Sequence, residues 1–101
     1  MLLLAFDTAT PAVTVALHDG STVLAESAEV DARRHGELLA PAIARVLAAS
    51  GRTQRELTGI AVGVGPGPFT GLRVGLVTAR ALGEALRIPV HGVCKIGRAH
   101  V

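Results

Sequence analysis

The hydrophobic residues near the start of the chain fall in short runs that are typical of strands. A continuous apolar run covers residues 2–6 and ends at Asp7, and two further runs cover 13–17 and 22–30. A Thr-Ala-Thr-Pro turn separates the first two runs, and the dipeptide Asp-Gly at 19–20, a strong hairpin signal, separates the next two. The pattern therefore predicts three consecutive antiparallel strands.

Further along, apolar residues recur at helical spacing in two segments. The first predicted helix covers 37–50, with Pro41 in about its first turn and Gly51 at the position of a C-terminal cap. The second covers 71–86, and β-branched strand segments lie before it at 60–64 and after it at 88–93. The order βββαβαβ predicts an α/β fold in which helices pack on a mixed sheet and a right-handed crossover joins the last strands.

Composition narrows the class of protein. With 101 residues, half of them apolar and 18% charged, the chain is expected to form one packed domain. A net charge of +2 without a basic cluster gives no indication of nucleic-acid binding. A single cysteine excludes an internal disulfide, and no run approaches the roughly 18 apolar residues of a membrane span. No basic residues precede the opening apolar run, so a secretion signal is not expected. We expect a cytoplasmic location instead.

The glycine-rich segment GVGPGPFTGLRVG, residues 63–75, raises the question of phosphate binding. A Walker loop would require Lys after Gly71, where Leu72 stands, and a dinucleotide fingerprint fails because its third glycine is replaced by Thr70. An anion site at the start of the following helix stays open, with a purely structural turn as the alternative. The residues of that weak anion or nucleotide site would be Asp7, Gly65, Gly67 and Thr70.

Small residues form a stripe along the second predicted helix, which suggests a close helix contact. An interior glycine costs about 1 kcal/mol relative to alanine, so a compensating contact is expected. That contact is either with a partner's helix or with the domain's own sheet, and the sequence leaves both open. The residues of the predicted partner interface are Gly71, Leu72, Gly75, Leu76, Ala79 and Gly83. The first predicted helix carries a similar stripe, Ala40, Ala44 and Ala48, opposite its Leu/Ile face.

Residues able to carry out chemistry are sparse. Asp7 is a single carboxylate at a strand end, where a turn-capping role is favoured over a metal or water site. The spacing of His91 and Cys94 has no supporting context, and no Ser/His/Asp or Cys/His arrangement is recognisable. The sequence therefore predicts neither catalytic residues nor a resident metal.

Four segments in order, LLLAFDTATPAVTVAL, RRHGELLAPAIARVL, IAVGVGPGPFTGLRVGL and RIPVHGV, resemble the bacterial TsaB family of tRNA threonylcarbamoyladenosine biosynthesis proteins. The resemblance covers roughly residues 1–94 and implies an actin-like, Hsp70-like ATPase fold of the ribonuclease H-like class. Pro68 stands where many members carry Ser, which weakens the phosphate-loop interpretation further.

The resemblance also implies a function. Members are non-catalytic relatives of TsaD that bind it as a heterodimer through their helices, with the ATPase TsaE joining the complex and tRNA contacted indirectly. The resemblance implies that this chain binds no cofactor by itself and that ATP is bound only in the assembled complex. The catalytic paralogue carries an H-x3-H metal pair after the last strand, where this chain has Cys94-Lys95. The alternative function is an ATP-binding enzyme of the same fold, TsaD-like or an ATPase, and self-association as a homodimer through the same helices is a third expectation.

The end of the chain requires a separate interpretation. Family members run about twice this length, so residues 1–95 are expected to form the N-terminal lobe, with a second lobe missing. Residues 96–101, IGRAHV, match the translation of a common sequencing-adapter read-through, ATC GGA AGA GCA CAC GTC. We therefore expect a non-native tail after Lys95 and assign it no functional residue.

Overall fold

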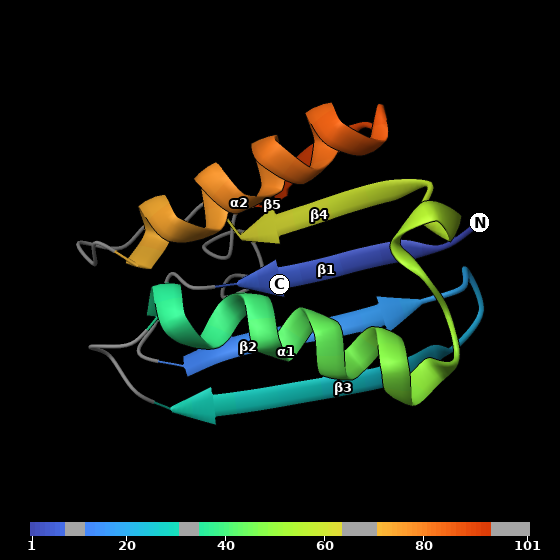
Figure 1. Ribbon diagram of the computed structural model, residues 1–101, viewed down its shortest axis with the longest axis horizontal. Helices are drawn as coiled ribbons and strands as arrows, with labels where there is room; N and C mark the ends of the chain where they lie inside the picture. Colours follow the sequence, from blue (N-terminus) through green and yellow to red (C-terminus); the bar gives the residue numbers. More distant parts are fainter. Residues whose placement is uncertain (8–11, 31–34, 64–70, 94–101) are drawn as a thin grey trace, which may run out of the picture.

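Five strands form one mixed sheet in the computed structural model, which describes residues 1–7, 12–30, 35–63 and 71–93 (Figure 1). The strands are β1 (Leu3–Asp7), β2 (Ala12–His18), β3 (Val23–Val30), β4 (Gly59–Gly63) and β5 (Val90–Val93). Their order across the sheet is β3-β2-β1-β4-β5; β1, β2 and β3 pair antiparallel, and β4 pairs parallel with β1 and β5. The predicted α/β class with a mixed sheet is confirmed.

Both long helices lie on the same face of this sheet. Helix α1 (His35–Ser50) runs over β2 and β3, and α2 (Gly71–Leu86) runs along β4 (Figure 1). The bounds of α2 are those predicted, whereas α1 begins two residues before the predicted start. Pro41 therefore falls in its second turn, not its first, and is exposed there. A short 3-10 helix, η1 (Gln54–Glu56), was not predicted; it is capped by Thr53 and Glu56.

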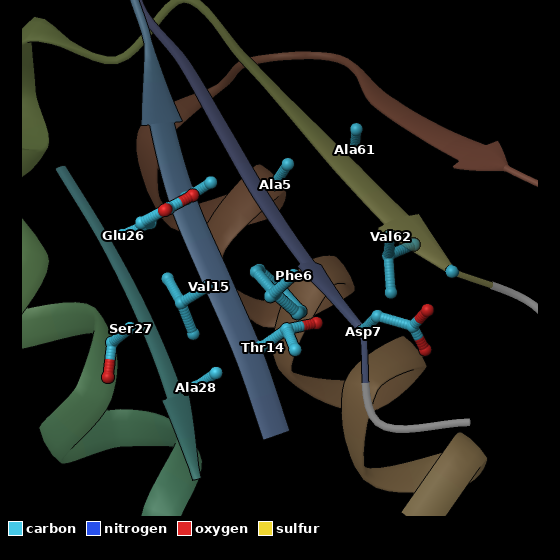
Figure 2. Close-up of a pocket in the computed structure, with 12 residues that line it drawn as sticks. Ala5, Phe6, Asp7, Thr14, Val15, Glu26, Ser27, Ala28, Ala61 and Val62 are labelled. Atoms are coloured by element: carbon cyan, nitrogen blue, oxygen red, sulfur yellow. The ribbon is translucent and has the colours of Figure 1, made fainter. Parts of the chain in front are cut away.

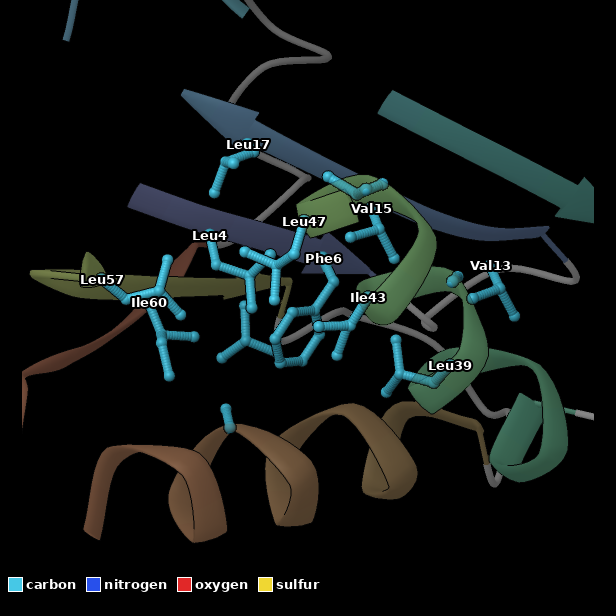
Figure 3. Packing of buried hydrophobic residues seen from close by; sticks show 14 of the residues in the cluster. Leu4, Phe6, Val13, Val15, Leu17, Leu39, Ile43, Leu47, Leu57 and Ile60 are labelled. Carbon is cyan, nitrogen blue, oxygen red and sulfur yellow. The ribbon is translucent and has the colours of Figure 1, made fainter. Parts of the chain in front are cut away.

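A single hydrophobic core fills the space between the sheet and the helices (Figure 3). Alternate residues of each strand point to this side, as the period of two requires. Its strand members include Leu4, Phe6, Val13, Val15, Leu17, Ile60 and Val62, and its helix members include Leu39, Ala42, Ile43, Val46, Leu47 and Ala79. The core takes residues from strands β1, β2 and β4 and from helices α1 and α2. This shared core holds the sheet and both helices together as one unit.

Local hydrogen bonds fix the ends of the elements. Both helices end in a left-handed residue that lets the next amide reach back to the last turn. Gly51 (φ 71°) does so after α1, where the Arg52 N–H donates to the Leu47 carbonyl at 3.1 Å. Arg87 (φ 56°) does so after α2, where the Ile88 N–H donates to the Gly83 carbonyl at 3.1 Å. The predicted cap at Gly51 is confirmed.

The start of the chain is bound to the beginning of β4. The Leu2 N–H donates to Thr58 Oγ1 at 2.9 Å, and the Thr58 N–H donates to the Leu2 carbonyl at 2.8 Å. These bonds set the parallel register in which the carboxyl ends of β1 and β4 lie side by side. None of the described helices is long and apolar enough to cross a membrane.

Candidate functional site

The small-residue stripe of α2 faces the domain's own sheet. Gly75 and Gly83 are buried, and Ala79 is 0% exposed and belongs to the core. A Cβ atom at Gly83 would lie 2.5 Å from Val90 Cγ2 and 3.2 Å from the Ile88 carbonyl oxygen, so a side chain at this position would require Val90 to shift. Leu76 is half-buried against the same core.

Of the two contacts that the sequence left open, the structure therefore shows packing on the domain's own sheet for Gly75, Ala79 and Gly83. Gly83 has Val90 and Ile88 directly beside it, and Gly75 and Ala79 are buried on the same side of the helix. The assignment of these residues to a partner interface stays a prediction. Gly71 and Leu72 begin helix α2, but their surroundings lie outside the described residues. The wider prediction, that this helix contacts a partner, stays a prediction.

A different set of small residues is exposed on the two helices. On α1 the predicted alanine stripe faces outward, and on α2 a second stripe with the same four-residue spacing contains Val77, whose exposed fraction is 61%. Both helices lie on the same face of the sheet (Figure 1), and both stripes are exposed, so the stripes lie on the helix-covered side of the molecule. We call this the outer helix surface; its residues are Ala40, Ala44, Ala48, Val77, Ala81 and Ala85. The sequence missed its α2 half because the glycine stripe was the stronger small-residue pattern.

Asp7 is the one described residue of the predicted anion site. It ends β1 and is 9% exposed, and its carboxyl group lies against the α-carbon of Gly63 at the end of β4. A Cβ at Gly63 would be 2.6 Å from Asp7 Cγ and 2.8 Å from each carboxylate oxygen, so a side chain at this position would require the Asp7 carboxylate to move. The other three members, Gly65, Gly67 and Thr70, lie outside the described residues.

The sheet face opposite the helices carries a hollow of about 640 Å³ (Figure 2). Its floor consists of small side chains, Ala16, Ala5 and Ala61, on three neighbouring strands, with Thr14 and Asp7 one row further along. The sequence signal for this floor was the alternation of small with large apolar residues along the strands. In the part of the chain that the structure describes, no three His, Cys, Asp or Glu side chains are placed to hold a metal ion.

Two carboxyl groups, those of Asp19 and Glu56, stabilise local turns and do not belong to a binding site. The backbone N–H groups of Thr22 and Ser21, both 2.8 Å from Asp19 Oδ1, lower the pKa of that carboxyl group at the β2–β3 hairpin. The Thr53 N–H, 2.7 Å from Glu56 Oε2, lowers the pKa of Glu56 in η1.

Arg45 links a helix to the edge of the sheet. From α1 it forms an ion pair with Glu29 on edge strand β3 and lies 3.3 Å from the Ser27 hydroxyl. This contact ties α1 to β3.

The strand order, the two helices on one face and the carboxylate that ends the first strand define a lobe of the actin-like, ribonuclease H-like class. Residues 22–100 match the family described as "TsaD: tRNA N6-adenosine threonylcarbamoyltransferase", and the chain belongs to this family. The predicted resemblance to TsaB is also confirmed: the tRNA threonylcarbamoyladenosine biosynthesis protein TsaB of Escherichia coli is 39% identical over 93 residues, which are 92% of this chain and 40% of that protein.

Further proteins are similar to this chain. An uncharacterized protein of Mycobacterium tuberculosis is 52% identical over 97 residues, 93% of this chain and 46% of its own. The solved structure of YeaZ from Pseudomonas aeruginosa superimposes with a TM-score of 0.87 at 38% identity, covering 92% of this chain and 43% of that one. RuvC of Thermus thermophilus, at 11% identity and a TM-score of 0.58, shares the fold alone. The chain spans less than half the length of TsaB and YeaZ.

Proposed function

We propose that this chain acts in the biosynthesis of tRNA threonylcarbamoyladenosine as a non-catalytic scaffold that binds and activates a TsaD-type transferase. Its family membership and its similarity to TsaB support the pathway. The observation that carries the scaffold role is the outer helix surface: two adjacent helices that expose small and apolar side chains outward. A TsaE-type ATPase and tRNA would join through the transferase, in the cytoplasm.

The outer helix surface has the properties of a helix-packing interface. Alanine side chains at four-residue spacing permit interaxial distances near the lower end of the usual range of about 8–10 Å. Among the helix residues whose burial is described, Val77 is the large hydrophobic side chain that is exposed, and the charged Arg80 and Glu84 are exposed on the same helix. An apolar centre with charged residues at its margin is the usual composition of a protein–protein interface.

The non-catalytic part of the proposal rests on the composition of the described site. Asp7 is the buried acidic side chain at the edge where β1, β4 and β5 end, and it packs against Gly63. Chemistry on a nucleotide requires further phosphate-binding groups, and none is among the described residues next to it. The second candidate, an ATP-binding enzyme of the same fold, would use this same carboxylate.

Co-purification with a TsaD-type transferase tests the scaffold role. Val77→Asp and Ala81→Arg place charges at the centre of the outer helix surface and are expected to weaken binding at least tenfold, while the far-UV circular dichroism spectrum stays that of the parent. Ser21→Arg, at the exposed tip of the β2–β3 hairpin, is the matched control and should bind normally. Undiminished binding by both helix variants would contradict this surface.

A calorimetric titration with Mg-ATP separates the two candidate functions. The scaffold proposal expects no heat of binding for the chain alone. Tight binding that is lost in Asp7→Asn would favour the enzyme instead.

A further inference from the structure

Strand β5 forms one edge of the sheet, and among the described strands only β4 pairs with it. Val90, His91 and Gly92 are exposed, and the exposed fraction of Val90 is 36%. Helix α2 packs mainly over β4, so it does not cover this edge. An edge strand presents backbone N–H and C=O groups with which a further strand can pair.

The register of β5 determines which of its backbone groups face outward. The Ile60 N–H donates to the Pro89 carbonyl at 3.0 Å, and Ile60 lies opposite Val90. In a parallel ladder such a residue bonds the two neighbours of the residue opposite it, so the peptide groups of Pro89 and His91 face β4. The N–H and C=O groups of Val90 and Gly92 therefore face the open edge.

The other edge strand, β3, is protected in ways that β5 is not. Its pairing with β2 contains a register shift near His18, and Glu29 is held in the ion pair with Arg45. Bulges and charged side chains are common means of blocking a sheet edge. The segment Val90–Val93 contains no Lys, Arg, Asp or Glu, and Pro89 directs its carbonyl toward β4, so these features do not block β5.

A hollow of about 390 Å³ lies beside this edge, lined by residues of α2 and by the start of β5. Gly83 lines it without a side chain, and Ile88 and Val90 make its apolar walls. Arg80 and Glu84, about one helical turn apart, complete the lining. A strand added beside β5 would direct alternate side chains toward α2, so an apolar side chain could enter the hollow while the backbone pairs with the edge.

We propose that β5 binds an extended segment of another protein by strand addition. The outward groups of Val90 and Gly92 supply the hydrogen bonds, and the hollow beside Gly83 selects an apolar side chain. These backbone groups specify an extended occupant, because the backbone of a helix is already paired within the helix. The proposed site uses none of the residues of the outer helix surface, so it can fail while the scaffold proposal holds, and the reverse.

An NMR titration of the full chain tests this proposal directly. The probe is a capped heptapeptide, Lys-Thr-Val-Thr-Val-Thr-Lys, whose alternating pattern favours an extended strand. About four net hydrogen bonds correspond to a dissociation constant on the order of 1 mM. The amide resonances of Val90 and Gly92 should shift most, and that of His91, which faces β4, should shift less. A control peptide with Asp in place of both Val residues should bind about fivefold more weakly, because the hollow is apolar.

Two substitutions at one position separate the backbone donor from the side chain. Gly92→Pro removes an outward N–H and leaves the pairing with β4 in place, so it should weaken peptide binding about fivefold. Gly92→Ala is the matched control, because it adds a side chain and keeps the N–H; it should bind within about twofold of the parent. Circular dichroism shows whether Gly92→Pro folds, and the parent titration with the two peptides carries the test if it does not.

Four results would each overturn the proposal. They are no shift of the Val90 and Gly92 amides up to about 10 mM peptide, equal binding of the Asp peptide, undiminished binding by folded Gly92→Pro, and an equal loss in Gly92→Ala. Shifts of the same amides on raising the protein concentration without peptide would also overturn it, because they would assign the edge to a second copy of the chain.

Discussion

The contact between Asp7 and Gly63 shows how one residue depends on the absence of a side chain in another. Gly63→Ala would place a methyl group 2.6 Å from the Asp7 carboxyl carbon, so the Asp7 side chain or the backbone at Gly63 has to shift. We expect the free energy of unfolding to fall by roughly 1–3 kcal/mol, the usual cost of overpacking. Urea denaturation measures it.

A double-mutant cycle supplies the control for this prediction. In an Asp7→Ala background the obstructing carboxylate is gone, and Gly63→Ala should then cost well under 1 kcal/mol, an interaction term of the size that contacting residues show. Equal costs in both backgrounds would show that the carboxylate is not the cause.

Arg87 and Gly51 occupy the same position at the ends of their helices, with φ angles of 56° and 71°. A left-handed conformation costs an L-residue about 1–2 kcal/mol and glycine almost nothing, although glycine also loses more chain entropy on folding. Arg87→Gly should therefore raise the free energy of unfolding by about 0.5–1 kcal/mol, measured as a higher urea midpoint.

Gly51→Ala is the matched comparison, because nothing lies within 4 Å of the Cβ it would add. Its expected loss of about 1 kcal/mol reports the backbone conformation alone. If both substitutions shift the midpoint in the same direction, the left-handed position is not what controls these two helix ends.

At the scale of elements, periodicity predicted helix α2 to the residue and most strands to within two residues. Strands alternate large apolar residues with small ones, and Gly51 marked a helix end, so local signals were sufficient there. The face on which α2 packs could not be predicted, because a glycine stripe permits close approach by a sheet as well as by a helix. Only the position of Val90 against Gly83 distinguishes the two.

The packing of α2 on β5 predicts a change of sign for one substitution. Gly83→Ala gains about 1 kcal/mol of helix propensity but places its methyl group 2.5 Å from Val90 Cγ2, at an overpacking cost of roughly 1–3 kcal/mol. It should destabilise the parent protein. In a Val90→Ala background the collision is relieved, and the same substitution should be neutral or stabilising.

Thermal and urea denaturation of the parent, Gly83→Ala, Val90→Ala and the double variant measure this coupling between α2 and β5. Ala85→Gly, on the exposed side of the same helix, reports propensity alone and should cost about 1 kcal/mol. A stabilising effect of Gly83→Ala in the parent would mean that the stripe is open to a partner after all.

At the scale of the whole molecule, the class of fold could be predicted from the order of strands and helices along the chain. The order of the strands across the sheet could not be predicted in this way. Pairing of β1 with β4 joins segments about 56 residues apart, through bonds such as Leu2 to Thr58, and no local pattern encodes such a register. The floor of the hollow, formed by Ala16, Ala5 and Ala61, exists only through these registers. The candidate site was therefore predictable at Asp7, which ends a strand, and not on the two surfaces that the tertiary structure assembles.

The shared core predicts that the chain unfolds as one unit, although it spans less than half the length of TsaB and YeaZ. Among the described residues, fifteen buried hydrophobic residues form one cluster; they come from Leu2, β1, β2, α1, β4, α2 and the connection before β4. If either long helix detached, the core residues that pack against it would become exposed. We expect a single urea transition with a slope of about 1–2 kcal/mol per molar, as for small two-state domains. The chain has no Trp or Tyr, so circular dichroism for the helices and methyl NMR for the sheet are the two probes. Two results would contradict this expectation: transitions at different urea concentrations for the two probes, or binding of a hydrophobic dye without denaturant. Either would indicate a molten state, in which the core becomes ordered only when the sheet face opposite the helices is covered.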